Sequence, residues 1–326
     1  MDDGVLLLNV AGPTEVFNSA NHESRKRGGP PLYQVELLSP AGGLLRTSSG
    51  IEIATAPLPD PAQARYHTIA VAGGMRNDAM IRNSDTLAWL RQMADGAERI
   101  ASIGGGAFLL AQAGLLNMRR AVTHWLYRER LQTAYPGIRV DPEALFVSDG
   151  KLYTTAGSTA GIDLAIQMLE EDYGRKLAID VARVLMVARK RSGEQPQISA
   201  ELKAQSATVP RIASAAEWIV ANLDSPLRVR DIAERFAMSE RNFSRAFKKE
   251  LSITPQQFIA HARIEAARRW LVGSSLPIDK IARRCGFSSA EQMTQSFRRV
   301  MAISPADYRQ THRHAGPPPA TADGAR

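Results

Sequence analysis

Cysteine is almost absent from this chain, which has a single one, Cys285, among 326 residues. One thiol cannot form an intramolecular disulfide, and it cannot build a metal site that needs several cysteines. This usage is typical of the reducing cytoplasm, where we expect the protein to act without a metal and without a cofactor. Long apolar runs are also missing at the start, where residues 5–8 are too few for a signal peptide or a membrane span.

Excess positive charge is present in only one part of the chain. The whole sequence has a formal net charge of +8. Residues 211–313 hold 18 basic and 10 acidic side chains, whereas residues 1–210 hold 22 of each. Binding to DNA phosphates requires such a local surplus of lysine and arginine. An ordinary solvated helical surface is the alternative interpretation, and the internal repeat in the same segment favours DNA binding.

The basic segment contains the same pattern of residues twice. The first copy consists of Ile232-Ala233, Met238-Ser239, Phe243, Phe247, Ile253, Pro255 and Phe258, and the second of Ile281-Ala282, Phe287-Ser288, Met293, Phe297, Ile303, Pro305 and Tyr308. Each copy predicts two short helices joined by a tight turn, which is a helix-turn-helix unit. Two such units can enter successive major grooves of double-stranded DNA, because the grooves recur about every 34 Å.

Helix geometry assigns the side chains that would contact DNA. In the first unit Ser239 is expected to cap a helix that buries Phe243 and Phe247, while Met293 and Phe297 are the buried pair of the second. The exposed residues that we expect to read bases are Arg241, Asn242, Arg245, Glu291, Gln292, Thr294 and Gln295. The residues expected to contact phosphates are Lys248, Lys249, Arg298 and Arg299. Arginine and asparagine have the donors and acceptors that recognise guanine and adenine, although any one of these side chains could be merely solvated.

The first half of the chain alternates between strand-like and helix-like segments. Strands are expected at 33–38, 67–72 and 99–103, with a hairpin at 144–155 that turns at Asp149-Gly150. Helices are expected from Ser84, at 107–112, at 160–173 and at 176–188. Strands that alternate with helices predict an α/β domain with a mostly parallel sheet covered by helices on both faces.

Composition places the domain boundaries. We assign residues 1–190 to the α/β domain, the polar stretch 191–210 to a linker, and residues 211–312 to an all-α domain with two helix-turn-helix units. Residues 313–326 contain Gly316-Pro317-Pro318-Pro319 followed by small side chains, which predicts a disordered tail.

Four motifs in the first half resemble the PfpI-type, class I glutamine amidotransferase-like fold. They are Ala11-Gly12-Pro13-Thr14-Glu15-Val16-Phe17, Ala107-Phe108-Leu109-Leu110-Ala111, Thr123-His124-Trp125 and Thr155-Ala156-Gly157-Ser158-Thr159-Ala160-Gly161-Ile162-Asp163. With the second helix-turn-helix unit, where Gly286-Phe287, Pro305 and Tyr308-Arg309 match the family signature, the chain is identified as a member of the GlxA-like branch of the AraC/XylS regulators. The resemblance implies a bacterial, cytoplasmic regulator of transcription that joins the nucleoid when it is bound to DNA.

The chain departs from its enzymatic relatives at the position of their chemistry. The resemblance places a cysteine nucleophile at a strand-to-helix elbow, where this chain has Gly104 and Gly105, and an acidic residue where this chain has Asn9. Glycine has no side chain that could attack a substrate, and a neutral amide cannot act as a carboxylate base. We therefore expect no catalytic residues in this domain. A serine triad of Ser102 and His124 is disfavoured, because Ser102 precedes the elbow.

A ligand pocket is expected at the carboxyl ends of the parallel strands. The candidate residues are Asn9, Gly73, Gly74, Gly104, Gly105 and His124. Backbone N–H groups of a glycine-rich turn before a helix can hold an anion, but the same glycines could serve only as tight turns. The resemblance implies that His124 faces the pocket, whereas a histidine beside a tryptophan is more often a packing residue.

Together these features predict a homodimeric regulator that binds promoter DNA and activates transcription with RNA polymerase. By analogy with relatives, the first domain would sense a small polar or nitrogenous effector and shift the population of DNA-binding arrangements. The alternatives are a PfpI-type hydratase or amidase fused to a DNA-binding domain, and a first domain used only for assembly. Relatives often have a basic residue at the position of Gln295, so the second unit is expected to read bases more weakly.

The resemblance also implies a β-strand before Asp3-Gly4-Val5. A parallel sheet without that strand would have an unfilled interior position. We therefore expect the polypeptide to begin upstream of Met1.

Overall fold

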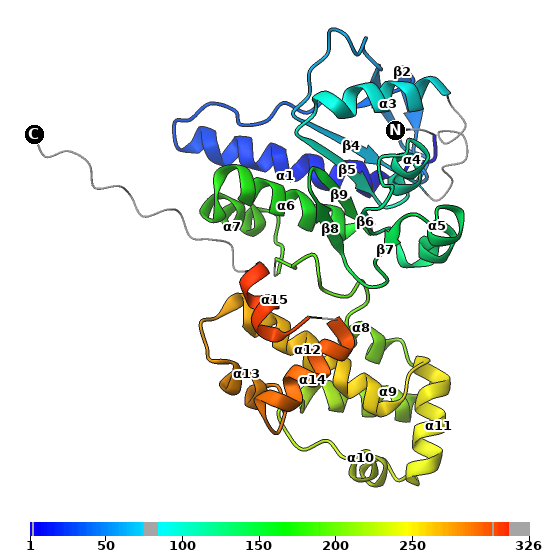
Figure 1. Cartoon of the computed structure of the whole chain (residues 1–326), viewed down its shortest axis with the longest axis vertical. Coiled ribbons are helices and arrows are strands. Elements are labelled where there is room, and N and C mark those ends of the chain that lie inside the picture. Colours follow the sequence, from blue (N-terminus) through cyan, green and yellow to red (C-terminus); the bar gives the residue numbers. More distant parts are fainter. Residues whose placement is uncertain (2, 75–83, 189, 302, 313–326) are drawn as a thin grey trace, which may run out of the picture. The chain divides into compact units, whose positions relative to one another are not determined.

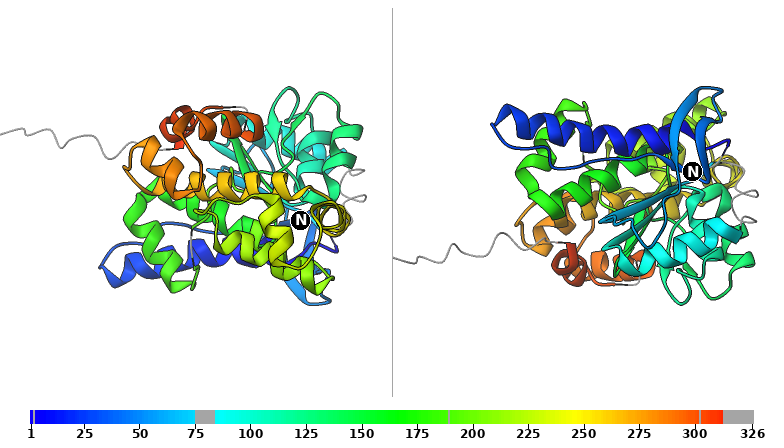
Figure 2. Two further views of the ribbon diagram at one scale, coloured as in Figure 1. Left: turned by 90° about the horizontal axis from the view of Figure 1, so that it is seen from below. Right: turned by 90° about the horizontal axis from the view of Figure 1, so that it is seen from above.

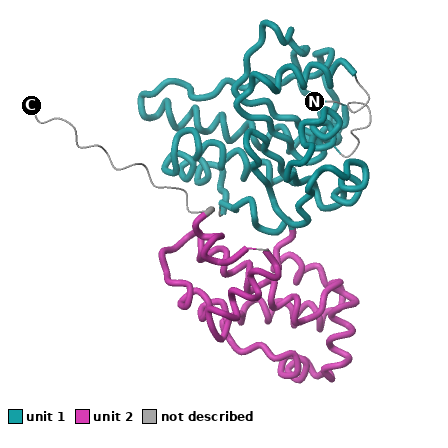
Figure 3. The backbone as a smooth tube through the Cα atoms, viewed as in Figure 1, with its two compact units in different colours: residues 1–197 teal, residues 198–326 magenta. Residues whose placement is uncertain are grey.

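The computed structural model describes residues 1, 3–74, 84–188, 190–301 and 303–312. The chain divides into two compact units, Met1–Gln197 and Ile198–Arg326, which Figure 3 shows in different colours. The tail predicted at 313–326 lies outside the described residues. Within the described part of the chain, no helix combines the length and the hydrophobicity needed to cross a bilayer.

A four-stranded sheet forms the centre of unit 1 (Figure 1). In order across the sheet, its strands are β4 (Thr68–Ala72), β5 (Arg99–Ile103), β9 (Leu152–Thr155) and β8 (Phe146–Asp149). Strands β4, β5 and β9 are parallel, and β8 runs antiparallel to β9. The predicted hairpin at Asp149-Gly150 and the mostly parallel sheet are confirmed.

Helices cover both faces of this sheet, because successive side chains of a buried strand point to opposite sides. On β5, Ile100 packs in a cluster with α3 (Ser84–Gly96) and α4 (Gly106–Gln112), whereas Ala101 packs with α6 (Thr159–Tyr173). Helices α1 (Leu7–Lys26) and α7 (Arg175–Val184) pack against α6 on that second face. Figure 2 shows the two helical layers on opposite sides of the strands. The expected α/β class of this domain is confirmed.

The remaining elements of unit 1 lie at the margins of this core. They are β1 (Leu38–Ser39), β2 (Ala41–Arg46), β3 (Glu52–Pro57), β6 (Arg120–Ala121), the 3₁₀ helix η1 (Trp125–Tyr127), α5 (Arg128–Ala134) and β7 (Arg139–Val140). The strand predicted over 33–38 is wrong except at Leu38, the first residue of β1. The backbone N–H groups of Leu32 and Tyr33 both donate to Asn21 Oδ1, at 2.7 and 2.8 Å. A side chain of α1 therefore satisfies donors at the start of this segment.

The described part of unit 2 is helical. Its helices are α8 (Ala200–Gln205), α9 (Pro210–Ala221), α10 (Val229–Arg235), α11 (Glu240–Leu251), α12 (Pro255–Gly273), α13 (Ile278–Arg284), α14 (Ala290–Met301) and α15 (Pro305–His312). Helix α12 belongs to two hydrophobic clusters, with Phe258 in the first and Leu271 in the second. The fully buried Cys285 lies in the second cluster. The prediction that α12 is the buried link between two helix-turn-helix units is confirmed.

Candidate nucleic-acid interface and the region around Gly104

Helix α11 is amphipathic, and its buried face fixes its rotation about its own axis. The Ser239 hydroxyl accepts a hydrogen bond from the backbone N–H of Asn242, so Ser239 is the N-cap that the sequence predicts. Phe243 and Phe247 are fully buried, with ring centroids 5.4 Å apart. Residues on the opposite side of α11 must therefore face away from the core.

The exposed side of α11 carries all five DNA contacts predicted in the first unit, Arg241, Asn242, Arg245, Lys248 and Lys249. No ion pair neutralises the four cationic groups within the described residues. Lys248 and Lys249 lie in the last turn of the helix. This surface therefore combines the side-chain donors that read base edges with cations that can approach phosphates.

Helix α14 is the equivalent element of the second unit. The Ser289 hydroxyl accepts from the backbone N–H of Gln292 at 3.1 Å, and Met293 and Phe297 are fully buried. Of the predicted contacts, Glu291, Gln292, Gln295, Arg298 and Arg299 are exposed, and Thr294 is half-buried. The two helices thus present corresponding faces.

Two of the side chains predicted on α14 already have hydrogen-bond partners. The hydroxyl of Thr294 donates to the carbonyl oxygen of Ala290 at 2.8 Å. The side-chain oxygen of Gln292 accepts from the backbone N–H of Ser288 at 2.8 Å. These local bonds compete with contacts to a base, and a pattern of exposed positions cannot reveal them.

The turns of the two units adopt the same left-handed conformation at equivalent positions. Gly286 has φ of +78° and Ala237, at the matching position of the first unit, has φ of +53°. A Cβ atom on Gly286 would lie 1.8 Å from the carbonyl oxygen of Leu223. The prediction that Gly286 supplies a tight turn is therefore confirmed, and its close contact with Leu223 requires glycine.

Arg263 holds the Leu223 segment that packs against this turn. The sequence patterns did not indicate this role. Its Nε donates to the carbonyl oxygen of Leu223 at 3.1 Å, and its Nη2 donates to that of Ser225 at 2.7 Å. Arg263 lies on α12 and its partners lie about 40 residues earlier. No local periodicity links a helix to a loop at such a separation, so only the folded chain shows this role.

In unit 1, one amide side chain joins the carboxyl ends of the sheet. Asn9 is 3% exposed, its Nδ2 donates to the carbonyl oxygen of Gly73 at 2.7 Å, and its Oδ1 accepts from the backbone N–H of Ser158 at 2.6 Å. The hydroxyl of Thr123 donates to the carbonyl oxygen of Gly104 at 3.0 Å. The predicted elbow is therefore held by hydrogen bonds that come from distant parts of the chain.

The glycines of this region allow backbone segments to pack closely. A Cβ atom on Gly73 would lie 2.1 Å from the nitrogen of Gly106, and one on Gly74 would lie 2.1 Å from the oxygen of Gly4. Gly104 has φ of +60°. A cavity of about 620 Å³ lies in unit 1, and Asn9 is the one pocket candidate among its lining residues. These contacts favour the interpretation of Gly73 and Gly74 as sites of close approach.

His124 caps the short helix η1. Its Nδ1 accepts from the backbone N–H of Leu126 at 3.3 Å, and the rings of Trp125 and Tyr127 lie 5.6 and 5.9 Å from its own. Burial lowers the pKa of His124, which keeps its imidazole neutral near pH 7. The hydroxyl of Ser102 is fully buried and has no hydrogen-bond partner among the described residues. The structure therefore contains no hydrogen-bonded pair of Ser102 and His124.

Replacing Asn9 with aspartate is expected to destabilise unit 1 by about 2 kcal/mol at neutral pH. An oxygen would replace the Nδ2 donor and face the carbonyl oxygen of Gly73, so only a protonated carboxyl could restore the hydrogen bond. Folding would then raise the pKa of the new carboxyl. The loss of stability is absent below the unfolded pKa, about 4, and grows as the pH rises through the folded pKa. Melting temperatures measured between pH 4.5 and 8 test this.

Asn117→Asp is the matched control, because Asn117 is an exposed asparagine of the same unit. Its melting temperature should follow that of the unmodified protein over the whole range. An equal loss for both variants, or a loss for Asn9→Asp that does not change with pH, would contradict the role assigned to Asn9.

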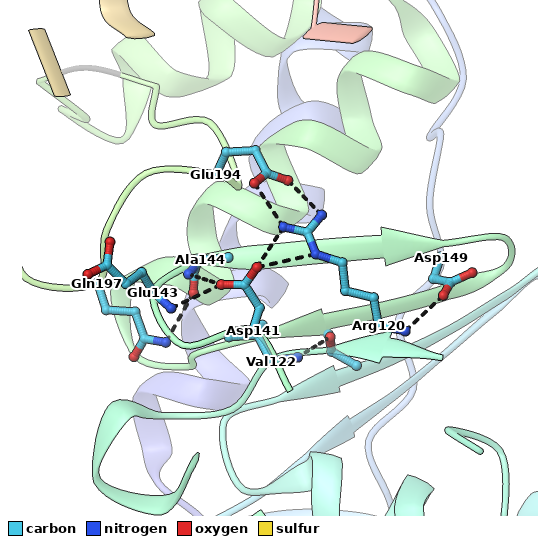
Figure 4. Close-up of polar contacts among 9 residues, drawn as sticks. Arg120, Val122, Asp141, Glu143, Ala144, Asp149, Glu194 and Gln197 are labelled. Carbon is cyan, nitrogen blue, oxygen red and sulfur yellow. Dashed lines mark hydrogen bonds and ion pairs between the residues drawn. The ribbon is translucent and has the colours of Figure 1, made fainter. Parts of the chain in front are cut away.

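Residues 191–197, which the sequence places in the linker, are bound to unit 1 (Figure 4). The guanidinium of Arg120 donates through Nη1 and Nη2 to the two carboxylate oxygens of Glu194, both at 2.9 Å. Asp141 accepts from Nη2 of the same guanidinium at 2.7 Å. The hydrogen bonds to Glu194 raise the pKa of Arg120 further above its usual value, so the guanidinium stays charged.

Gln197 attaches the end of this segment close to His124. Its Nε2 donates to the carbonyl oxygens of Thr123 and Ala144, both at 3.0 Å, and its Oε1 accepts from the backbone N–H of Trp125 at 2.8 Å. Helix α8 follows within the stretch that was predicted to be linker. A movement of the backbone at Thr123 or Trp125 would therefore change the hydrogen bonds of Gln197, the last residue of unit 1.

Comparisons with known proteins agree with this two-part organisation. The DJ-1/PfpI family model matches residues 2–171, and a helix-turn-helix domain model matches residues 232–311. The chain is 29% identical to the HTH-type transcriptional regulator GlxA of Rhizobium meliloti, over 93% of this chain and 92% of that protein. It is also 29% identical to the HTH-type transcriptional regulator CdhR of Pseudomonas aeruginosa, over 85% of this chain and 82% of that protein.

Two further similarities each cover just over half of the chain. The chain is 34% identical to an isonitrile hydratase of Pseudomonas putida over 55% of this chain and 71% of the enzyme. A crystal structure of an AraC family transcriptional regulator from Pseudomonas putida matches with a TM-score of 0.50 and 23% identity, over 56% of this chain and 95% of that one. At that identity the structural match shows the fold alone.

Proposed function

Because the chain belongs to the DJ-1/PfpI family and carries an AraC-type helix-turn-helix domain, we propose that it is a sequence-specific regulator of transcription that binds double-stranded promoter DNA. The exposed cations of α11 carry this proposal, because they lie opposite the buried Phe243 and Phe247 and form no ion pair within the described residues. Similarity over nearly the full length of a named transcriptional regulator supports it. Activation, with RNA polymerase as a partner, is the mode of regulation that we propose.

The two recognition helices are assigned unequal roles. Arg241, Asn242 and Arg245 read bases through α11, while Lys248 and Lys249 hold phosphates. On α14, the local hydrogen bonds of Thr294 and Gln292 leave fewer side-chain groups for bases. The first unit therefore supplies most of the sequence preference, and Arg298 and Arg299 anchor the second to the backbone.

Selection of sites from random double-stranded DNA by the full chain tests this proposal. The expected result is one enriched motif, bound at least about a thousandfold more tightly than competitor DNA at physiological salt. Equal affinity for all sequences would leave a basic protein without a regulatory site and would overturn the proposal.

Lys249→Ala is expected to weaken binding to cognate and random DNA alike. Each phosphate contact releases condensed counterions, so losing one should make the plot of log affinity against log salt concentration shallower by about 0.9. Lys176→Ala removes the same charge from an exposed position on α7 of unit 1 and should leave the slope unchanged. An unchanged slope for both variants would show that Lys249 does not contact a phosphate.

Unit 1 is assigned a role in sensing and dimerisation without covalent chemistry. Gly104 has no nucleophile, and both polar ends of the Asn9 amide are bonded to the backbone. The effector expected is small and polar or nitrogenous, and it would act through the Thr123-His124-Trp125 segment that Gln197 contacts. Thermal-shift screening of the full chain with amines and amino acids tests sensing, because a ligand of the native state raises the melting temperature. A domain used only for assembly would give no shift.

A hydratase attached to a DNA-binding domain is the competing function, since the chain is similar to an isonitrile hydratase over 55% of its length. Hydration of an isonitrile by that class of relatives would need a nucleophile or an acid–base group at the elbow. The purified chain should turn over isonitriles no faster than buffer does. Turnover that Asn9→Leu abolishes would favour the enzyme instead.

A further inference from the structure

The segment 191–197, which we call the strap, is attached to unit 1 along its length. At its start, Nε of Arg191 donates to the carboxylate of Asp163 at 2.9 Å, and Asp163 is 2% exposed. In its middle, Glu194 pairs with Arg120 (Figure 4). At its end, Gln197 makes the three hydrogen bonds described above. A displacement of the strap would leave the buried Asp163 carboxylate without its cationic partner, which is costly.

Helix α8 begins three residues after Gln197 and is packed into unit 2. Ala200, its first residue, belongs to the same hydrophobic cluster as Phe258 of α12. The backbone N–H of Ala200 donates to Oε2 of Glu265 at 3.1 Å, and Glu265 is 6% exposed. Two residues therefore separate a segment fixed to unit 1 from a helix fixed to α12.

The buried carboxylate of Glu265 depends on α8. Among the described residues, the N–H of Ala200 is its one hydrogen-bond donor. Burial raises the pKa of the Glu265 carboxyl, and the hydrogen bond from Ala200 lowers it. A buried carboxylate that loses its donor is destabilised. The docking of α8 and the stability of the α12 core around Glu265 are therefore linked.

Helix α8 is too short to be stable without these contacts. It has six residues, and isolated helices shorter than about 12 residues are marginal in water. Its N-cap is Ser199, whose hydroxyl accepts from the backbone N–H of Leu202 at 3.1 Å. Ser199 follows Gln197 by two residues, so the attachment of the strap restricts where this cap can lie. The helix therefore has two accessible states, docked and released.

Release of α8 would act on both helix-turn-helix units through α12. Glu265 lies near the middle of α12, between Phe258 in the first hydrophobic cluster and Leu271 in the second. Arg263, two residues before Glu265, holds the Leu223 segment. A shift of this part of α12 therefore changes how the two recognition helices are held relative to each other.

We propose that α8 is a regulatory latch: while it is docked on Glu265, α11 and α14 keep the arrangement that binds DNA, and a displacement of residues 123–125 releases it. The inference rests on the proposed DNA-binding function and adds the route by which unit 1 controls it. An effector bound by unit 1 would act by changing the population of docked α8, without contacting unit 2.

Hydrogen exchange of the full chain, measured without DNA, tests the latch. In Gln197→Ala and in Glu265→Leu, the amides of Lys203–Ser206 should exchange at least about tenfold faster than in the unmodified chain. The amides of α11 should not change, which would show that unit 2 stays folded. Glu265→Gln is the matched control, because its side-chain oxygen can still accept from Ala200. Unchanged exchange of α8 in Gln197→Ala would overturn the proposal, because α8 would then not depend on the strap.

A double-mutant cycle on cognate DNA supplies the second test. Each single variant should weaken binding by at least about fivefold. The double variant should bind no more weakly than the weaker single variant, because both changes release the same helix. Losses that multiply in the double variant would show two independent sites and would overturn the proposal. If site selection finds no motif, the proposed function fails, while hydrogen exchange still decides whether the strap controls α8.

Discussion

Gly286→Ala is expected to unfold the second helix-turn-helix unit and to abolish binding of the full chain to its cognate DNA. The new Cβ atom would lie 1.8 Å from the carbonyl oxygen of Leu223 and 2.7 Å from Nη2 of Arg263. The first of these atoms belongs to the backbone, so the turn or the Leu223 segment has to move. A displacement of Leu223 breaks the hydrogen bond that its carbonyl oxygen accepts from Arg263.

The size of the effect follows from three costs. A left-handed backbone costs a residue with a Cβ atom roughly 1–2 kcal/mol. The lost hydrogen bond to a charged donor adds about 1.5–3 kcal/mol, and relief of the collision adds more. A total above about 4 kcal/mol is a large part of the stability of an ordinary domain, which is about 5–15 kcal/mol. Urea unfolding, followed by helical circular dichroism, measures this loss.

Gly273→Ala is the matched control in the same unit. Gly273 ends α12, and a Cβ atom added there would meet no other atom within 4 Å. Its urea midpoint should stay close to that of the unmodified protein, and its DNA binding should be retained. If both variants unfolded at the same urea concentration, the close contact at Gly286 would not be the cause of the lost stability.

Arg245→Ala is expected to weaken binding to the cognate site by about 1–3 kcal/mol, which is roughly 5- to 150-fold. The cause is the loss of a side chain that can donate two hydrogen bonds to one guanine. Arg245 is exposed on the face of α11 opposite Phe247, and no ion pair holds it within the described residues. Selection of sites by the variant should therefore show relaxed preference at one position and an otherwise unchanged motif.

Arg175→Ala separates base recognition from the loss of one charge. Arg175 is exposed at the start of α7 in unit 1, so its removal lowers the net charge equally without touching α11. Its affinities for cognate and random DNA should match those of the unmodified chain. If Arg245→Ala lost as much affinity for random DNA as for the cognate site, its role would be phosphate binding.

Local patterns were sufficient to predict the two helix-turn-helix units, although they did not predict α8 or the contacts of Arg263. The spacing of Phe243 and Phe247 sets the buried face of α11, Ser239 caps it, and Gly286 marks the second turn. Each of these features depends on residues within a few positions of one another, where helix geometry determines which side chains meet. The exposed positions of the recognition helices follow from the same rule.

Unit 1 depends more on contacts between residues far apart in the chain. Asn9 was a pocket candidate because of its position in a motif, yet its two hydrogen bonds join residues 64 and 149 positions away. Glu194 was assigned to a polar linker, and only its pairing with Arg120 shows that it belongs to unit 1. The composition of a segment shows whether it is polar, but it does not show which distant residues the segment contacts. The interpretations of segments 33–38 and 191–210 were limited for this reason.

Because the single cysteine is buried, spin labels can be attached at introduced cysteines without first replacing it. Cys285 is fully buried, and burial raises the pKa of its thiol to about 11, so the reactive thiolate is scarce at pH 7.5. Cysteines introduced at the exposed positions Lys176 and Arg230 would then be the only ones to react with a nitroxide reagent. Pulsed electron resonance could follow the separation of the two labels as operator DNA or an inducer is added.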